Sequence, residues 1–417
     1  MKRTTARAVA LLFACATLQA YSVLSHEAII DTAWDTHLRP LLLKRFPQAT
    51  PDELRNAHAN AYAGCIIQDM GYYPFGSHTF SDLVHYVRSG DFILNLLKEA
   101  RTLEEYAFAL GALAHYAADT RGHSIAVNRA VPIQYPKLAK EYGPVVTYAQ
   151  NPTDHLRVEF SFDVLQVARG SYAPQQYHDF IGFDVPADVL DRAFYDTYSI
   201  KLGDVFTDLD LALGTYRHTV SSLVPKMTRA AWDLKKDDLQ RVKPSLTRRA
   251  FVYNLSRASY RKQWDNKYKA PGVGSKILAF LIWILPKVGP LRALAFQAPS
   301  AQTESLFELS FDRTLTDYRR FLTEQGEGRL RLENRDFDTG ALTRPGEYSL
   351  ADRTYAWLAR TLAAQEHPAN NPELIRNVLD FFAGPDPPPE AEKNRKEWRK
   401  TVHALEKLRN AAAANSE

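Results

Sequence analysis

Three side chains that can bind a metal follow one another at four-residue intervals in the stretch AHYAADTRGH, residues 114–123. They are His115, Asp119 and His123. Four residues of an α-helix turn about 400°, so each interval moves the side chain only about 40° around the helix axis. All three groups should therefore project from one helix face. A single histidine on such a face is usually an ordinary buried polar residue, but three metal-capable groups at this spacing predict a metal site if other segments supply further ligands.

Further candidate ligands lie elsewhere in the chain. Zinc is bound by imidazole nitrogen and carboxylate oxygen in tetrahedral or five-coordinate sites, so one helix face cannot supply every ligand. His155 and Glu159, in NPTDHLRVEF, are again four residues apart. Asp69 lies in a turn rich in Gly, Tyr and Pro, His85 lies in FSDLVHY, and His26 lies near the N-terminus. Each of these residues alone has an ordinary explanation, but together they form an ordered series of ligands.

Helical periodicity dominates the chain up to about residue 235. Thr50 followed by Pro51 predicts a helix start, because Thr caps the first turn and Pro fits the first helical position. Thr102 with Glu105 three residues later predicts a capping box ahead of the stretch that carries the opening motif. Period-2 alternation, typical of strands, is nearly absent. The sequence therefore predicts an all-α fold.

The composition of the chain changes after about residue 240. A basic and aromatic run ends in a Pro-Gly break, and a Pro-rich stretch, AGPDPPPE, lies near residue 385. Such a stretch is typical of a stiff linker. We expect a signal peptide, a multi-helical domain, a helical extension with an apolar hairpin, and a linker with a charged C-terminal helix, at residues 1–20, 21–238, 239–383 and 384–417.

An apolar segment at residues 277–296 has two interpretations. Its unbroken apolar run is about nine residues, short of the roughly 20 that span a bilayer. Pro286 and Pro290 predict a helical hairpin. The hairpin is either buried in the core or makes peripheral contact with a membrane through Trp283 and the basic residues at its ends.

The first 20 residues, MKRTTARAVALLFACATLQA, have the basic start, short apolar run and terminal Ala of a secretory signal. Cleavage after Ala20 would expose Tyr21 and place the protein in the periplasm or outside the cell. It would also remove three basic residues, so the net charge falls from +4 to +1. The near-neutral charge gives no indication of nucleic-acid binding. Only Cys65 would remain, without a disulfide partner, because Cys15 lies in the signal; the bulky Phe13 argues against lipid attachment there.

The ordered ligand series resembles that of the zinc-dependent phospholipase C family, in the superfamily shared with the S1/P1 nucleases. In that family the order along the chain is a free N-terminal residue, His, Asp, His, His-x3-Asp, His and His-x3-Glu. This chain repeats the order over residues 21–165. The resemblance implies a multi-helical phospholipase C/P1 nuclease-like domain with three zinc ions.

The resemblance also implies which residues hold each ion. The first zinc would be held by Asp69, His85, His115 and Asp119. The second would be held by His123, His155 and Glu159. The third would be held by the amino and carbonyl groups of Tyr21 with His26, and Asp119 would bridge it to the first.

This chain departs from the family at a few positions. Tyr21 stands where the family has Trp, but backbone atoms are the ligands there. The Asp119-to-His123 spacing is tighter than in the family. His78 competes with His85 as a ligand, and we prefer His85 because its distance from Asp69 suits the family pattern.

Three functions fit this resemblance. A phospholipase C would cleave phospholipid head groups with metal-activated water that Asp69 orients or deprotonates. Tyr72, Tyr73 and Phe75 are then expected to be exposed at the rim of the head-group site, unless they simply pack within their loop. A single-strand nuclease would use the same metals with aromatic pockets that stack bases. Against it, the mature charge is nearly neutral and the first domain shows no interleaving of basic and aromatic residues, although the run at residues 249–269 could supply some. A non-catalytic metal-stabilised protein that binds membranes or partners needs only one closed site. We therefore predict a phospholipase C acting on phospholipid or another phosphodiester.

Overall fold

The computed structural model describes residues 22–169, 185–220, 224–242, 244–245, 247–248, 295–367, 370–384, 388–389 and 393–414. Within these ranges every named element is helical and the only β-type pairing is an isolated bridge. The all-α prediction is confirmed. None of the described helices is long and apolar enough to span a membrane. The predicted signal peptide, Tyr21 and residues 277–294 of the apolar segment lie outside the described residues.

The helices are joined by turns and loops, and η1, η2 and η3 are π or 3-10 turns. Up to residue 169 the elements are α2 (Val23–Ala33), η1 (Trp34–Leu38), α3 (Arg39–Arg45), α4 (Pro51–Gly64), η2 (Ile67–Tyr72), α5 (His78–Tyr86), α6 (Ser89–Glu99), α7 (Leu103–Arg121), η3 (Gly122–Val127), α8 (Asn128–Gln134), α9 (Pro136–Tyr142) and α10 (Pro152–Arg169). The later elements are α12 (Ala187–Tyr198), α13 (Leu202–Val205), α14 (Leu209–His218), α15 (Val224–Val242), α19 (Ala301–Gly326), α20 (Ser349–Ala364), α21 (Pro372–Phe381) and α23 (Arg395–Ala414).

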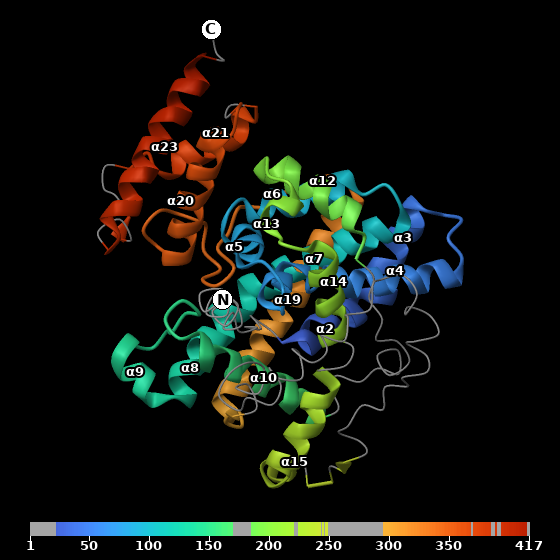
Figure 1. The fold of residues 1–417 in the computed structure, drawn as a ribbon. Coiled ribbons are helices and arrows are strands. Elements are labelled where there is room, and N and C mark those ends of the chain that lie inside the picture. Colours follow the sequence, from blue (N-terminus) through green and yellow to red (C-terminus); the bar gives the residue numbers. More distant parts are fainter. Residues whose placement is uncertain are drawn as a thin grey trace, which may run out of the picture.

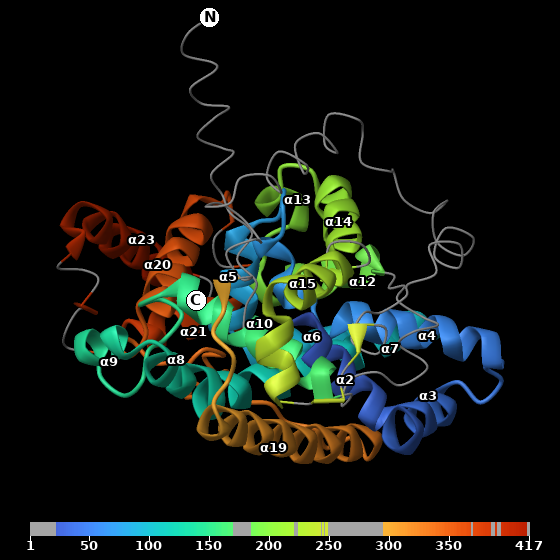
Figure 2. The same cartoon turned by 90° about the horizontal axis from the view of Figure 1, so that it is seen from below.

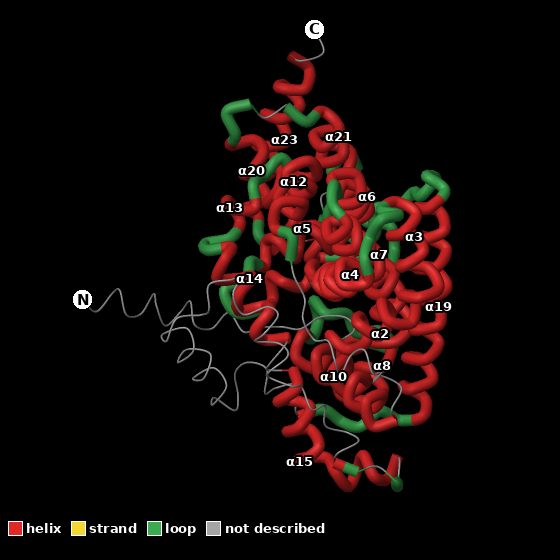
Figure 3. Tube along the Cα trace, turned by 90° about the vertical axis from the view of Figure 1, so that its right-hand side faces the viewer, coloured by secondary structure: helices red, strands yellow, loops and turns green. Residues whose placement is uncertain are grey.

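The helices surround α7, which packs most extensively on α4 (Figure 1). The long helix α19 runs along one outer edge of the molecule, where it packs on α7, η3 and α8 (Figures 2 and 3). Helices α20, α21 and α23 form a group at one end of the molecule, and α20 packs on α5 (Figure 1). One continuous cluster of buried apolar side chains extends from α2 to α23. The residues after 295 therefore share a core with the first helices.

Both predicted helix starts are present. The Thr50 side chain accepts from the backbone N–H of Glu53, and the Glu53 carboxylate accepts from the backbone N–H of Thr50. Thr102 and Glu105 form the same capping box at the start of α7. Each box satisfies backbone N–H groups that the first helical turn leaves without a partner. Local sequence thus determines where the two central helices begin.

Two glycines let α4 and α7 approach closely. A Cβ atom on Gly64 would lie 2.0 Å from the Phe108 carbonyl oxygen, and one on Gly111 would lie 2.1 Å from the Ala61 carbonyl oxygen. Any side chain at either position would force the backbones apart. The close approach brings the end of α4 alongside the middle of α7, where His115 lies.

The ligand-bearing stretch is not one continuous α-helix. Helix α7 ends at Arg121, and the π turn η3 begins at Gly122. A π turn pairs each residue with the fifth one along rather than the fourth, so the four-residue interval between Asp119 and His123 no longer means a 40° rotation. Such turns recur at functional sites. The predicted single stripe is therefore correct for His115 and Asp119 but altered at His123.

Candidate metal centre

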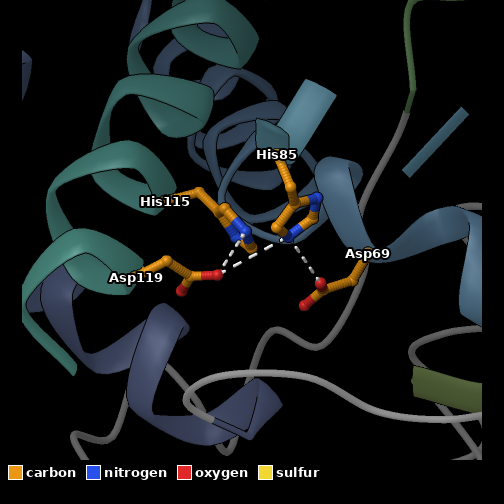
Figure 4. A group of neighbouring side chains, drawn as sticks. All are labelled: Asp69, His85, His115 and Asp119. Carbon is orange, nitrogen blue, oxygen red and sulfur yellow. Dashed lines mark ion pairs between the residues drawn. The ribbon is translucent and has the colours of Figure 1, made fainter. Parts of the chain in front are cut away.

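The first metal group consists of Asp69 on η2, His85 on α5, and His115 and Asp119 on α7 (Figure 4). One ligand atom from each residue lies within 4.8 Å of the ligand atoms of the other three, and all four residues are buried. Figure 4 shows the four side chains pointing toward one another from three separate elements. These are the residues that the resemblance implied for the first zinc.

The separations in this group suit a shared ion. Nε2 of His85 lies 3.4 Å from Asp69 Oδ1 and 3.6 Å from Asp119 Oδ2, and Nε2 of His115 lies 3.0 Å from Asp119 Oδ2. Two ligands bound at about 2.0–2.2 Å to a tetrahedral zinc are about 3.4 Å apart. The two longer separations exceed an ordinary hydrogen bond but match this spacing.

Both histidines of the first group present Nε2 to its centre. Nδ1 of His85 donates to the Ser81 carbonyl at 2.8 Å, and Nδ1 of His115 donates to the Cys65 carbonyl at 2.9 Å. A carbonyl only accepts, so each Nδ1 carries a proton, and the neutral form of each ring has its lone pair on Nε2. Metal-bound histidines typically have their second nitrogen fixed in this way.

Ser81 and the two interhelical glycines explain how the chain builds this geometry. The Ser81 hydroxyl donates to the Gln68 carbonyl and accepts from the Gly71 N–H, so it ties the turn that holds Asp69 to the helix that holds His85. The close approach of α4 and α7 puts the Cys65 carbonyl under His115. The group is therefore positioned by backbone contacts at several points.

The second metal group consists of His123 on η3, and His155 and Glu159 on α10. Their ligand atoms also lie within 4.8 Å of one another, and all three residues are buried. Nδ1 of His155 lies 2.7 Å from Glu159 Oε1, and its Nε2 lies 2.7 Å from Asn128 Oδ1. Nε2 of His123 lies 3.9 Å from Asp119 Oδ2, so the two groups are neighbours.

His26 lies beside the first group. Its ring stacks on that of His115, with centroids 4.5 Å apart, and its Nε2 lies 3.4 Å from Asp119 Oδ1. The two oxygens of Asp119 thus face different histidines, as a bridging carboxylate requires. Tyr21, the other implied ligand at this position, lies outside the described residues.

Asp163 holds His26 in place. It accepts hydrogen bonds from the backbone N–H groups of Leu24 and Ser25, at 3.0 and 3.2 Å, and from the Ser25 hydroxyl at 2.6 Å. These N–H groups belong to the first turn of α2, where a carboxylate is a favourable cap. Asp163 lies four residues after Glu159 on α10. The four-residue spacing that links His155 and Glu159 therefore continues to this residue.

Burial and mutual charge shift the pKa values of the group strongly. Burial, with the neighbouring His115, lowers the pKa of His26 to about 3. Burial alone would lower the pKa of His85, but the Asp119 and Asp69 carboxylates outweigh it and raise that pKa to about 10. Burial raises the pKa of Asp69. Protons therefore compete with a metal for His85 and Asp69, and acid should weaken metal binding by the first group.

The residues present fit zinc. Several buried ligand atoms have no hydrogen-bond partner among the described residues: Asp69 Oδ1, Nε2 of His85, His115 and His123, and both oxygens of Asp119. A buried polar atom without a partner costs about 1–3 kcal/mol, and more when it is charged. The two carboxylates and two imidazoles of the first group, and the two imidazoles and one carboxylate of the second, are ligand types that zinc prefers. Dications bound in the two groups would give these atoms partners.

The aromatic residues predicted at the rim divide into two kinds. Tyr72 and Tyr73 are buried, at 2% and 3% exposed, so the expectation that they are exposed is wrong. Tyr72 contacts the edge of the His85 ring, and Tyr73 packs on Tyr216 inside the core. Phe75 is 39% exposed and has a φ of 65°. The sequence did not indicate which of these three rings the turn directs into the core.

His78 and Asp338 show what the sequence left open or missed. His78 lies at the start of α5 and touches Tyr72, away from the first group, while His85 joins it. Asp338 is fully buried, and its Oδ1 lies 3.5 Å from Nε2 of His123. It lies in the stretch DFDTG, more than 170 residues after Glu159, and no spacing pattern links it to the other ligands.

Comparison with known proteins agrees with the geometry. The family model described as zinc dependent phospholipase C matches residues 25–207. No curated protein and no solved structure gives a significant match. The matched range contains His26 and every residue of both metal groups. Residues 25–207 of this chain thus match the zinc-dependent phospholipase C family, the family that the ligand series resembles.

Proposed function

We propose that this chain is an exported phospholipase C that hydrolyses the phosphodiester bond between the glycerol and the head group of a phospholipid. The family match and the two buried groups support a zinc phospholipase-type hydrolase. The observation that carries the proposal is the first metal group, in which buried ligand atoms from three elements face one another at the separations of zinc ligands. The lipid substrate, the third ion and export belong to the proposal.

Each residue of the first group has a role in this reaction. Zinc bound there supplies an acidified water and positive charge for the phosphate oxygens. Asp69 would help to hold the ion and would orient a water beside it; burial raises the pKa of this carboxyl. His85 and His115 hold their neutral Nε2 atoms in place through the backbone carbonyls behind them. Asp119 would connect the first group to His26, because its two oxygens face His115 and His26.

A third ion is proposed at His26. Oδ1 of Asp119 lies 3.4 Å from Nε2 of His26, so this pair could share an ion. Tyr21 would complete this position with its amino and carbonyl groups after cleavage at Ala20. An α-amino group must be unprotonated to bind a metal, so the uncleaved precursor would lack this ligand. Export and activation would then be one step.

On the substrate side, Phe75 is the one of the three predicted rim residues with an exposed ring. Tyr72, at the end of η2, contacts the His85 ring and would line the wall behind the head group. Peripheral membrane contact through residues 277–296 remains part of the proposal. Replacing Trp283 and Ile284 by Ser should abolish binding to phospholipid vesicles while zinc content stays unchanged; equal vesicle binding would reject that contact.

The test uses the mature protein that begins at Tyr21. Zinc per chain is measured by elemental analysis, and hydrolysis of phosphatidylcholine vesicles and of single-stranded DNA is measured on the same sample. About three zinc ions with lipid cleavage are expected. DNA cleavage alone would make the protein a nuclease, and zinc without either activity would favour a non-catalytic role.

A matched protein with one extra residue ahead of Tyr21 tests the N-terminal ligand. We expect it to hold one zinc ion fewer and to lose most of its activity. Full zinc content and activity in that protein would reject ligation by Tyr21.

A further inference from the structure

A tight turn at residues 336–340, outside the family-matched residues, lies directly against the metal centre. The Phe337 ring contacts the rings of His85 and His115, with centroids 5.1 and 6.0 Å away, and the Phe337 N–H donates to the His85 carbonyl at 3.3 Å. Gly340 has a φ of 70°, and a Cβ there would lie 2.4 Å from the Thr120 carbonyl oxygen. The turn therefore fits closely against the ligand-bearing end of α7.

Asp338, at the centre of this turn, has a carboxylate whose two oxygens have different surroundings. Its Oδ2 accepts hydrogen bonds from the hydroxyls of Tyr86, at 3.1 Å, and Tyr348. Its Oδ1 is buried without a hydrogen-bond partner among the described residues and lies 3.5 Å from Nε2 of His123. Two tyrosines thus fix the carboxylate so that its open oxygen faces a proposed ligand of the second group. The separation is again about that of two ligands of one tetrahedral ion.

The backbone of the same turn orients His155. Nδ2 of Asn128 donates to the Asp338 carbonyl at 2.6 Å. Because this carbonyl can only accept, the amide of Asn128 must turn its oxygen toward His155, 2.7 Å from Nε2. A neutral imidazole has a single N–H, which this contact places on Nε2. The lone pair on Nδ1 then faces Glu159, which is the arrangement a cation at the second group requires.

We propose that Asp338 is an additional ligand of the ion bound by His123, His155 and Glu159, and that its carbonyl holds His155 in the binding tautomer through Asn128. The proposal rests on zinc binding by the second group. Two histidines and one glutamate are three protein ligands, and zinc accepts four or five. The region after residue 295 would thereby complete a site whose other ligands all lie within the family-matched residues.

The test compares zinc retention in the full-length mature protein, in Asp338→Asn and in Asp336→Asn. Asp336 is also buried in this turn, but its Oδ1 accepts from the Thr339 N–H, a bond that Asn can keep. Each protein is titrated with a chelator, and the zinc that remains per chain is counted. We expect Asp338→Asn to release one ion at about 10–100-fold lower chelator concentration. Asp336→Asn should match the wild type.

Cobalt substitution and zinc-free melting separate ligation from folding. A carboxylate that binds the ion contributes to the visible absorption of the cobalt form, so Asp338→Asn should change that spectrum, whereas Asp336→Asn should not. Without metal, Asp338→Asn should melt no lower than the wild type, because it removes a buried charge. Its zinc-induced rise in melting temperature should be smaller.

Tyr348→Phe covers the case in which Asp338→Asn does not fold. It keeps the carboxylate and removes one hydroxyl that fixes it, so we expect a smaller loss of zinc retention in the same direction. Unchanged retention in Asp338→Asn, or in Tyr348→Phe if the first variant does not fold, would overturn the role of Asp338. A wild-type protein that binds no zinc would instead reject the proposed function.

Discussion

Helices α7 and α23 are of similar length but differ in their surroundings. Helix α7 buries 17 of its 19 residues, whereas α23 buries four of 20. Helix α7 is covered by neighbours on all sides, so His115 and Asp119 have no access to water. The polar residues of α23 face solvent, and one apolar stripe around Leu408 holds it to α20 and α21.

This difference shows that buried charged residues need an explanation that exposed charged residues do not. Exposed charges on α23 are satisfied by water and need no further reason. A buried charge must be paired, hydrogen-bonded or bound to a metal, because the desolvation cost is otherwise too large. Asp119 meets that condition through its neighbouring histidines, and an ion bound between them would meet it further. A bound metal would therefore help to stabilise the interior around α7, whereas the C-terminal helices are stabilised by apolar packing.

Removal of zinc should give the largest separation between the two regions. A ligand at a thousandfold excess over its Kd contributes about 4 kcal/mol per site to the free energy of unfolding. We expect chelation to speed amide hydrogen exchange in α7 and α10 and to leave α23 nearly unchanged. Exchange followed by mass spectrometry with and without chelator measures this. An equal change in both regions would contradict the comparison.

Asp119→Ala should come next, because one carboxylate faces both the first group and His26. Breaking a buried charge pair costs about 3–5 kcal/mol. We expect loss of two bound ions, of nearly all activity and of several degrees in Tm. Glu104→Ala, an acidic residue in the first turn of the same helix, is the control and should keep its zinc. Full zinc content in Asp119→Ala would reject the bridging role.

Gly111→Ala should disturb the centre without touching a ligand. The added methyl meets the Ala61 carbonyl at 2.1 Å and forces α4 away from α7, at a cost of about 1–3 kcal/mol. The Cys65 carbonyl then moves from His115, so zinc affinity should fall as well. Gly203→Ala is the matched control, since nothing lies within 4 Å of a Cβ there. Unfolding and zinc titration of both variants decide the matter.

Asp163 should make stability depend on mildly acidic pH. Burial raises the pKa of Asp163 to about 6, above its ordinary value of 3.8. The folded state therefore binds more protons than the unfolded state between about pH 4 and 6, and the free energy of unfolding falls as pH rises through that window. Melting of the zinc-free protein should show this slope, and Asp163→Asn should lack it. Identical pH profiles would show that Asp163 does not titrate there.

Arg360→Ala should have the smallest effect on the centre. Nη1 of Arg360 on α20 donates to the Thr401 hydroxyl of α23 at 2.6 Å. Loss of this bond should cost about 0.5–1.5 kcal/mol and loosen α23 alone. Zinc content and activity should equal those of the wild type. A loss of zinc in this variant would show that the two regions are more closely coupled than their packing indicates.

Local patterns in the chain determined the helices and the chemical identity of most proposed ligands. Capping boxes at Thr50 and Thr102 act within one turn, so they are readable without knowledge of the fold. The same holds for His115 with Asp119, and for His155 with Glu159, because helical rotation is a property of neighbouring residues. The order of these ligands along the chain then predicted the family whose model matches residues 25–207.

Long-range packing alone decided the rest. Only the folded chain directs Tyr72 and Tyr73 inward, brings His85 rather than His78 to the first group, and changes the register of His123 through a π turn. Asp338 reaches His123 across more than 200 residues of sequence. Such contacts depend on how separate helices and turns meet in space, and no local period in the sequence encodes that meeting.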